Sequence, residues 1–309
     1  MHRFILRRLL MMVPVLFGVM FVIFTLVYIT PDDPAMVILG GDMAHPEAIA
    51  ALRAEMGLDD PFLVQFTRYV GRAVRLDLGT SFSTRRPVFD ELADRFPNTA
   101  TLAGLGVLLA IAVGIPLGIL CSTRHHSIFD TVTSALGVVA LSIPNFWLGL
   151  ILILFFSFNL RMLPVSGLGT PAHWIMPTLT VGLSAAGEFM RFSRSSMLEV
   201  IRQDYIRTAR AKGQKESVVI FRHALKNAMI PVITIVGLSF GTLLGGAVLT
   251  ETVFALPGVG SFMVHSIMTR DFPIIQGGVL MIAVAFSFVN LLVDILYALV
   301  DPRVRSQYK

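Results

Sequence analysis

Residues 204–231 read DYIRTARAKGQKESVVIFRHALKNAMIP and separate two long apolar runs of the chain. Connections between neighbouring helices usually take only a few residues, so a long connection with its own helix signals is unusual. Asp204 suits the first turn of a helix, where a carboxylate faces free amides, and Gly213 suits the left-handed residue that ends one. A second helical pattern, over residues 217–230, leads directly into the next apolar run. We therefore expect two short basic helices that meet at a glycine bend.

The composition of the chain indicates a membrane protein. Of its 309 residues, 55% are hydrophobic and 15% are charged, whereas soluble proteins carry roughly 25% charged residues. The mean hydropathy is +0.75. The single cysteine, Cys121, excludes an internal disulfide, and we interpret the net charge of +5 as a matter of membrane topology rather than nucleic-acid binding.

Six apolar runs predict an all-α polytopic membrane protein with six transmembrane helices. A helix of about 20 apolar residues crosses the hydrocarbon core of a bilayer. The predicted spans are residues 9–29, 99–121, 131–158, 174–190, 228–250 and 274–300. The first has no small-residue cleavage motif after it, so we expect an uncleaved span rather than a signal peptide. The third contains Pro144, and the fourth, which is the weakest, contains Glu188.

The distribution of Lys and Arg predicts that both ends of the chain lie in the cytoplasm. With six spans the two termini share a side, and that side holds sixteen of the 25 Lys and Arg residues. Nine of the sixteen lie in the loop of residues 191–227. Positive residues favour the cytoplasmic side in short loops, and the seven in residues 30–98 lie in a segment long enough to escape that rule.

Residues 30–98 form a long segment between the first two spans, and their pattern predicts short helices on the outer face. Pro46, Pro61 and Pro87 each precede a helical pattern, and Gly57 suits the end of the first. These helices have too little apolar surface for an independent core. We therefore expect them to cover the outer ends of the spans.

The basic loop at residues 204–231 fits two roles. A basic amphipathic helix can lie on anionic lipid. Alternatively, a compact pair of helices with small and basic residues on its exposed face can fit a groove on a partner protein, and we expect Ala209 and Ala211 to lie on that face. Physical chemistry alone leaves both roles open.

Motifs along the chain favour the second role. DYIRTARAKG and RHALKNAMIP, within residues 204–231, resemble the cytoplasmic coupling loop of ABC importer permeases of the dipeptide, oligopeptide and nickel group. Other segments match motifs of that family in the same order: residues 31–34, 57–61, 77–81, 86–88, 195–200, 256–260, 270–273 and 301–305. The loop departs from the general pattern at Arg207, Thr208 and Ala209, where other ABC permeases have Glu-Ala-Ala, so the acidic residue is absent.

The resemblance implies the type I ABC importer permease fold and a place in a larger complex. It implies a multi-pass protein of the bacterial inner membrane, divided into residues 1–29, a periplasmic helical segment at 30–98 and a core permease domain at 99–309. Two related permease subunits would form the pore, and a periplasmic binding protein would deliver the substrate. Two cytoplasmic ATPases would bind ATP and Mg²⁺, which agrees with the absence of a G-x-x-x-x-G-K-[ST] motif from this sequence. This chain would bind no metal or other cofactor and would not be an enzyme.

The resemblance also implies which residues contact the ATPases. They lie in the glycine bend and beside it: Asp204, Tyr205, Arg207, Thr208, Ala209, Arg210, Ala211, Lys212, Gly213 and His223. Asn145, a polar residue within the third span, is a candidate for the substrate path.

Glu188 and Asp294 are carboxylates at membrane depth, where an unpaired charge is expensive. We expect each to be paired by one of three arginines: Arg191, Arg194 or Arg303.

The sequence leaves the substrate open among dipeptides, oligopeptides, glutathione-like molecules and nickel chelates. A protein of a different class, an ion-coupled secondary transporter, would need paired charges near the membrane midplane and an internal repeat. The two halves, residues 1–158 and 159–309, do not mirror each other. We therefore favour the importer.

Overall fold

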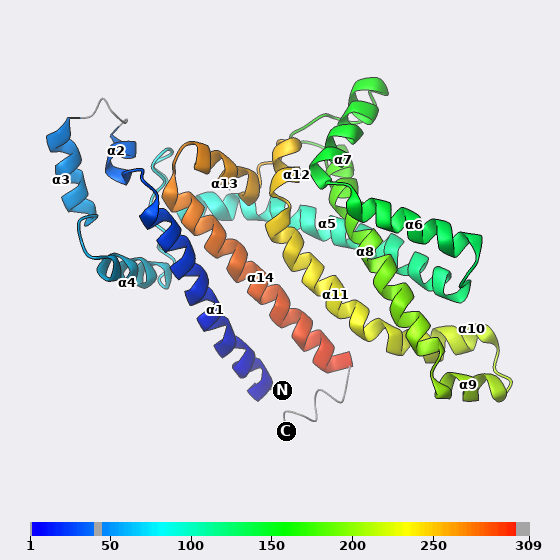
Figure 1. Cartoon of the computed structure of the whole chain (residues 1–309). Coiled ribbons are helices and arrows are strands. Elements are labelled where there is room, and N and C mark those ends of the chain that lie inside the picture. Colours follow the sequence, from blue (N-terminus) through cyan, green and yellow to red (C-terminus); the bar gives the residue numbers. More distant parts are fainter. Residues whose placement is uncertain (1, 40–44, 301–309) are drawn as a thin grey trace.

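The structure, a computed structural model, describes residues 2–39 and 45–300 of the chain, and within those ranges every named element is a helix. Figure 1 shows an elongated bundle with α1 (His2–Ile29) and α14 (Phe272–Val300) side by side at one flank. The start of α1 and the end of α14 lie at the same end of the bundle as α9 (Asp204–Ala211). This arrangement agrees with an all-α polytopic membrane protein.

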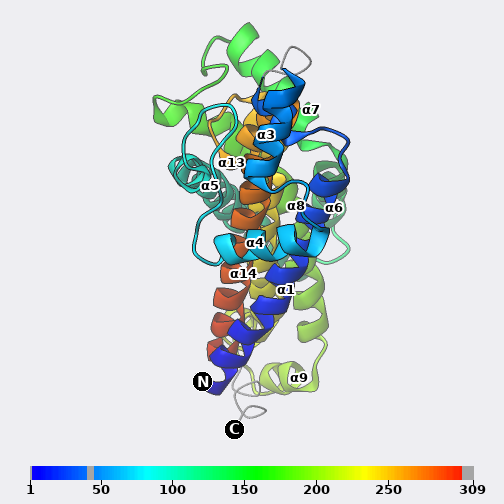
Figure 2. The ribbon, with the colours of Figure 1, turned by 90° about the vertical axis from the view of Figure 1, so that its left-hand side faces the viewer.

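The outer segment contains the expected short helices. They are α2 (Pro34–Ile38), α3 (Pro46–Met56) and α4 (Phe62–Ala73). Gly57 ends α3 with a φ of 64°, as its position predicts. Aromatic rings hold α4 against α1, since Phe62 and Phe66 lie 5.4 and 5.5 Å from the ring of Phe24. Figure 2 shows α4 crossing near the C-terminal end of α1.

The helix expected after Pro87 is longer than predicted. It is the beginning of α5 (Val88–Thr123), which continues for 36 residues through Pro97 and Pro116. At 1.5 Å per residue α5 is roughly 54 Å long, which exceeds the ~30 Å hydrocarbon core. The last part of the outer segment, from Val88, and the second predicted span are therefore one continuous helix.

Close backbone contacts join α5 to α8 (Ile175–Ile201). A Cβ atom on Gly114 would lie 2.4 Å from the carbonyl oxygen of Ala186, and one on Gly118 would lie 2.5 Å from that of Met190. Only glycine permits this approach, which lets helices pack without large side chains between them. The pair α5 and α8 forms the centre of the bundle.

The span predicted over residues 131–158 is broken in the structure at Pro144. α6 (Ile128–Ser142) ends before Pro144, α7 (Asn145–Leu152) begins after it, and the axis bends by 99° between them. A π-helical turn, Ile153–Asn159, continues α7. Proline disfavours helical geometry at the preceding residue and removes a backbone donor, so the helix breaks there.

Four helical segments are long and apolar enough to cross a membrane, and the bent pair makes a fifth. The four are Ile5–Ile29, Val88–Thr123, Glu216–Gly245 and Phe272–Ile295. The fourth predicted span lies in α8, which has 27 residues but also carries Glu188, Arg191 and Arg194. The polytopic class is confirmed, and the number of six spans stays a prediction.

The helices after α9 complete the bundle. α10 (Glu216–Val218), a π-helical turn (Val219–Ala224) and α11 (Leu225–Gly246) form one helical run, as expected. α11 packs on α14 through glycines: a Cβ atom on Gly237 would meet Val293, and one on Gly241 would meet Phe286. At the end of the bundle opposite α9 lie α12 (Val248–Val253) and α13 (Val259–Met268).

Candidate functional site

The glycine bend of the basic loop has the predicted geometry. Asp204 lies in the first turn of α9, and Gly213 follows its last turn with a φ of 75°. Arg210 spans the bend, because its Nη2 lies 2.6 Å from Oε1 of Glu216 on α10. The hydrogen bond to Glu216 raises the pKa of the Arg210 guanidinium, so this contact stays charged. This exposed ion pair thus links the end of α9 to the start of α10.

One face of α9 is packed against the membrane helices. Ile206 and Ala209 are buried against Met197 of α8 and Val219 at the start of the next helical run. The expectation that Ala209 lies on the exposed face is therefore wrong. Residues three apart share a face of a helix, so Ala209 lies on the same buried face of α9 as Ile206. This packing attaches α9 to the lower part of α8.

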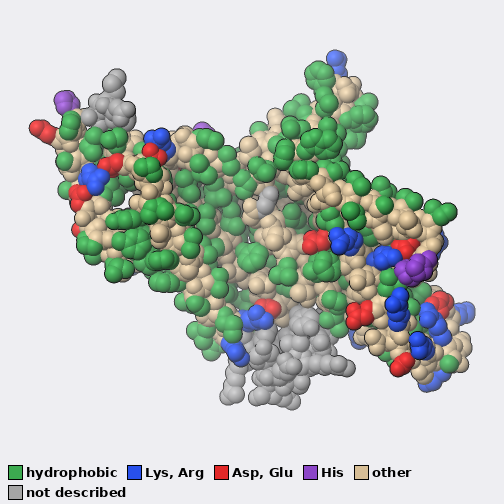
Figure 3. Space-filling model, viewed as in Figure 1, with side chains coloured by type: hydrophobic (Ala, Val, Ile, Leu, Met, Phe, Trp, Pro, Cys, Tyr) green, Lys and Arg blue, Asp and Glu red, His purple; other side chains and the backbone are tan. Residues whose placement is uncertain are grey.

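The opposite face of α9 is exposed and mostly polar. Eight of the ten predicted contact residues are exposed: Asp204, Tyr205, Arg207, Thr208, Arg210, Ala211, Lys212 and Gly213. His223 is half-buried, and its Nε2 lies 2.7 Å from Oε1 of Gln214. Two large apolar side chains, Tyr205 and Phe221, are 42% and 64% exposed beside these charges. Figure 3 shows charged side chains gathered over α9 and α10.

A buried ion pair joins α6 to α8 near this loop. Asp130 is 3% exposed and accepts hydrogen bonds from Nε and Nη2 of Arg194 at 2.6 and 2.8 Å. The backbone N–H of His126 also donates to Asp130, and the ring of His125 lies 3.1 Å from the same carboxylate. The sequence pattern did not reveal this group because 64 residues separate Asp130 from Arg194.

The membrane carboxylates differ from their predicted pairings. Asp294 is paired with Arg8 of α1 at 3.0 Å, and among the described residues neither Arg191 nor Arg194 forms an ion pair with it. Glu188 accepts a hydrogen bond from Oγ of Ser239 on α11 at 3.1 Å. Among the described residues Glu188 has no arginine at ion-pair distance, because Arg194 turns to Asp130. Arg303 lies outside the described residues.

Asn145 lies at the break between α6 and α7 and is half-exposed. Within the described part of the chain its side chain has no hydrogen bond. Its neighbours Pro144 and Phe146, with Val138 and Trp147, line a shallow groove of about 400 Å³. The fold therefore exposes Asn145 at a bend, and its place on the substrate path stays a prediction.

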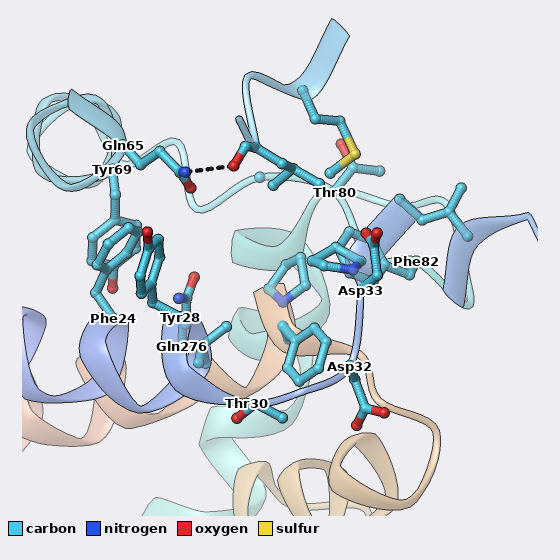
Figure 4. Close-up of a pocket in the computed structure, with 18 of the residues that line it drawn as sticks. Phe24, Tyr28, Thr30, Asp32, Asp33, Gln65, Tyr69, Thr80, Phe82 and Gln276 are labelled. Atoms are coloured by element: carbon cyan, nitrogen blue, oxygen red, sulfur yellow. Dashed lines mark hydrogen bonds between the residues drawn. The ribbon is translucent and has the colours of Figure 1, made fainter. Parts of the chain in front are cut away.

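The outer segment encloses a cavity of about 750 Å³ between α1, α4 and the first turn of α14. Figure 4 shows Phe24, Tyr28 and Tyr69 together on one side of it and Asp33 with Phe82 on the other. The hydroxyl of Tyr69 is buried without a hydrogen-bond partner among the described residues, and burial raises the pKa of Tyr69 to about 12. The outer segment is thus a packed structure with an internal hollow.

Ion pairs fix the walls of this cavity. Arg53 of α3 lies 2.5 Å from Asp33, and Arg72 of α4 lies 2.8 Å from Asp77. The hydrogen bond from Arg72, together with one from the backbone of Gly79, lowers the pKa of Asp77. These contacts join α3 and α4 to the chain segments on either side of them.

Two buried carboxylates join motifs that are far apart in the sequence. Asp271 accepts a hydrogen bond from Oγ of Ser81 at 2.6 Å, across 190 residues. Glu251 accepts from Oγ1 of Thr99 at 2.6 Å and from the backbone N–H of Ser261 at 2.9 Å. Burial raises the pKa of the Glu251 carboxyl, and these hydrogen bonds oppose the shift. Sequence reasoning missed Glu251, which directly follows an apolar run.

The arrangement defines a helical membrane protein with an anchored, exposed loop at one end. Residues 114–306 match the family described as binding-protein-dependent transport system inner membrane component. Residues 1–103 match the N-terminal part of such membrane components. The chain belongs to this family.

Curated relatives cover the whole chain. The dipeptide transport system permease protein DppB of Escherichia coli (strain K12) is 40% identical and covers 99% of this chain and 100% of its own length. The glutathione transport system permease protein GsiC of Salmonella typhimurium (strain LT2) is 42% identical, with 99% of each chain covered. Both are permease subunits by name.

Solved structures support the fold. Two inward-facing structures of the MetNI methionine ABC transporter have TM-scores of 0.54 and 0.57 at 20% and 18% identity. Each covers 68% of this chain and 96% of the matched chain. Because the identities are low, the likeness concerns the fold alone.

Proposed function

We propose that this chain is a pore-forming permease subunit of an ATP-driven importer for dipeptides or oligopeptides in the bacterial inner membrane. The observation that carries the proposal is the 40% identity to a dipeptide permease over 99% of the chain. The exposed, anchored bend of residues 204–213 supports it, because a passive linker needs neither buried packing nor an ion pair across its bend.

The fold suggests how ATP-driven movement reaches the pore. Two ATPases carrying ATP and Mg²⁺ would contact the exposed face of α9, while Ile206 and Ala209 hold that helix to α8. Displacement of α9 then moves α8 as a unit, and the bond between Arg194 and Asp130 carries the movement to α6. Hydrolysis belongs to the partners, and this chain supplies the moving helices.

The proposed assembly also fixes an orientation. The basic loop, the start of α1 and the end of α14 lie at one end of the bundle, which would be cytoplasmic. The outer segment and α13 lie at the other end, where a substrate-binding protein would approach. A second, homologous permease subunit would complete the pore.

Glutathione-type substrates are a second candidate, supported by the 42% identity to a glutathione permease. The two candidate substrates are distinguished by measuring ATP-driven uptake into vesicles that contain the complete complex and the loaded binding protein. Uptake of dipeptide with exclusion of glutathione supports the first proposal. Uptake of glutathione alone supports the second.

The docking surface has its own test. Arg207 is 74% exposed on the free face of α9, so Arg207→Glu should weaken ATPase binding at least about tenfold without unfolding the chain. Arg202→Glu, at an exposed position just before α9, is the matched control. Copurification of the ATPases and substrate-stimulated ATP hydrolysis are the measurements. Equal behaviour of the two variants would place the docking surface elsewhere.

The buried position of Ala209 decides how a variant there is interpreted. Ala209→Glu would put a charge into the apolar contact with Met197 and Val219. That change would release α9 from α8, so a loss of ATPase binding in this variant would not show that Ala209 contacts the ATPase. Only variants at exposed positions of α9 test the docking surface.

A further inference from the structure

Glu188 and Arg191 occupy one face of α8, one turn apart. Residues at this spacing have Cβ atoms about 5–6 Å apart. Glu188 is half-buried and Arg191 is exposed, although most of their neighbours on α8 are buried against other helices. The only described hydrogen bond to the Glu188 side chain is the 3.1 Å bond from Ser239 on α11.

Both charges lack an ionic partner within the described part of the chain. Arg194, the nearest other arginine on α8, is bound to Asp130. Among the residues that the structure describes, no acidic side chain lies within ion-pair distance of Arg191, and no basic one lies within that distance of Glu188. The two residues are near each other on the helix, yet they do not form a salt bridge.

This face of α8 is unsuited to lipid. The sequence placed Arg191 at the start of the cytoplasmic loop, but α8 continues to Ile201, so Arg191 lies beside Glu188 near the middle of this helix. An Arg or Asp at the centre of a membrane helix costs about 2.5–3.5 kcal/mol on insertion scales, and such residues face a water-filled cavity or the bundle interior. The surface that carries Glu188 and Arg191 therefore faces water or another subunit. Figure 3 shows an acidic and a basic side chain together in this view over α8 and α11, apart from the charged group over α9 and α10.

Ser239 belongs to the side of α11 that faces α8. Gly237 and Gly241 on α11 pack against Val293 and Phe286 of α14. Each is two residues from Ser239, and two residues correspond to about 200° around a helix. The hydroxyl of Ser239 thus lies opposite the α14 contact and completes a polar strip between the two helices.

We propose that Glu188 and Arg191, with Ser239 beside them, form a dipolar site on the translocation pathway that binds the two charged ends of a short peptide. The Glu188 carboxylate accepts the α-ammonium group, and the Arg191 guanidinium donates to the terminal carboxylate, for which its planar fork is suited. An extended dipeptide spans at most about 7 Å, close to the separation of the two positions. The site rests on the proposed function and adds the recognition of free peptide ends within the membrane.

The test uses the purified complex in nanodiscs without the binding protein. Retention of radiolabelled dialanine is compared with that of its N-acetylated and C-amidated forms. Glu188→Gln should weaken binding of free dialanine about tenfold and leave the N-acetylated form unchanged, because that form lacks the ammonium group. Arg191→Gln should likewise weaken binding of free dialanine about tenfold and leave the C-amidated form unchanged, because that form lacks the carboxylate. Arg191→Lys should restore part of the loss.

Controls separate this site from general damage. Glu199→Gln changes an exposed carboxylate further along α8 and should bind all three ligands like the wild type. Equal losses for free and blocked peptides, or no retention by the wild type, would overturn the site. ATP-driven uptake with the loaded binding protein is measured alongside. If the wild type takes up peptide but the variants bind it as the wild type does, the site is refuted and the importer function stands. If the wild-type complex takes up no peptide, the importer function is refuted.

Discussion

Asp130 shows how much one buried charge depends on its partner. Its side chain is 4% exposed, while that of Arg194 is 26% exposed. Arg194→Gln would leave the carboxylate with the His126 amide, the His125 ring and the Ser134 hydroxyl. We expect the variant to lose about 2–3 kcal/mol of stability, below the 3–5 kcal/mol of fully buried pairs because Arg194 reaches solvent.

Thermal unfolding of the purified protein in detergent measures this loss. Arg202→Gln, at the exposed C-cap of α8, should unfold at nearly the wild-type temperature. A melting temperature for Arg194→Gln equal to that of the control would mean that Asp130 is held by its other contacts.

At the scale of elements, the contact between α5 and α8 makes the sharpest prediction. A Cβ atom at Gly118 would lie 2.2 Å from Oγ of Ser193 and 2.5 Å from the Met190 carbonyl oxygen. Gly118→Leu should therefore separate the helices and cost at least about 1–3 kcal/mol. Gly71→Leu in α4, where nothing lies within 4 Å, should be neutral or stabilising by up to about 1 kcal/mol. Folded yield and melting temperature distinguish them, and similar values would refute the close contact.

Local signals in the sequence predicted several elements correctly. Helices follow Pro46 and Pro61, and Gly213 adopts the left-handed conformation at the bend. These features depend on a few neighbouring residues, which a sequence displays directly. The resemblance to a permease family could also be recognised from the sequence, because the family's motifs occur in order along the chain.

Features that depend on distant partners could not be predicted. A proline within an apolar run is compatible with a straight or a broken helix: α5 continues through Pro97, whereas α6 ends before Pro144. The neighbouring helices decide between the two outcomes. Likewise, Glu188 lies on the same helix as Arg194 and was an expected partner, but Arg194 bonds to Asp130 on another helix. Ala209 is likewise buried because α9 packs against α8, which the sequence does not display.

At the scale of the whole molecule, the orientation can be tested by labelling introduced cysteines. The native Cys121 is buried, so it contributes little background. Lys215 directly precedes α10 at the basic end, and Met162 lies in the segment after the π-helical turn of α7, which Figure 1 shows at the opposite end of the bundle. The two variants are Lys215→Cys and Met162→Cys. A membrane-impermeant maleimide should label Met162→Cys in intact spheroplasts and Lys215→Cys only after permeabilisation. The reverse pattern would refute cytoplasmic termini.

The modest hydropathy of α8 has a consequence for biosynthesis. Twelve of its 27 residues are buried, and its glycine and alanine backbone lies directly on that of α5. A segment with charges on one face enters lipid poorly by itself. α5, made earlier in synthesis, supplies the surface on which α8 partitions, so insertion of α8 should depend on the prior insertion of α5, with α6 and α7 made between them. Loosening the glycine contact would then reduce insertion before it affects transport.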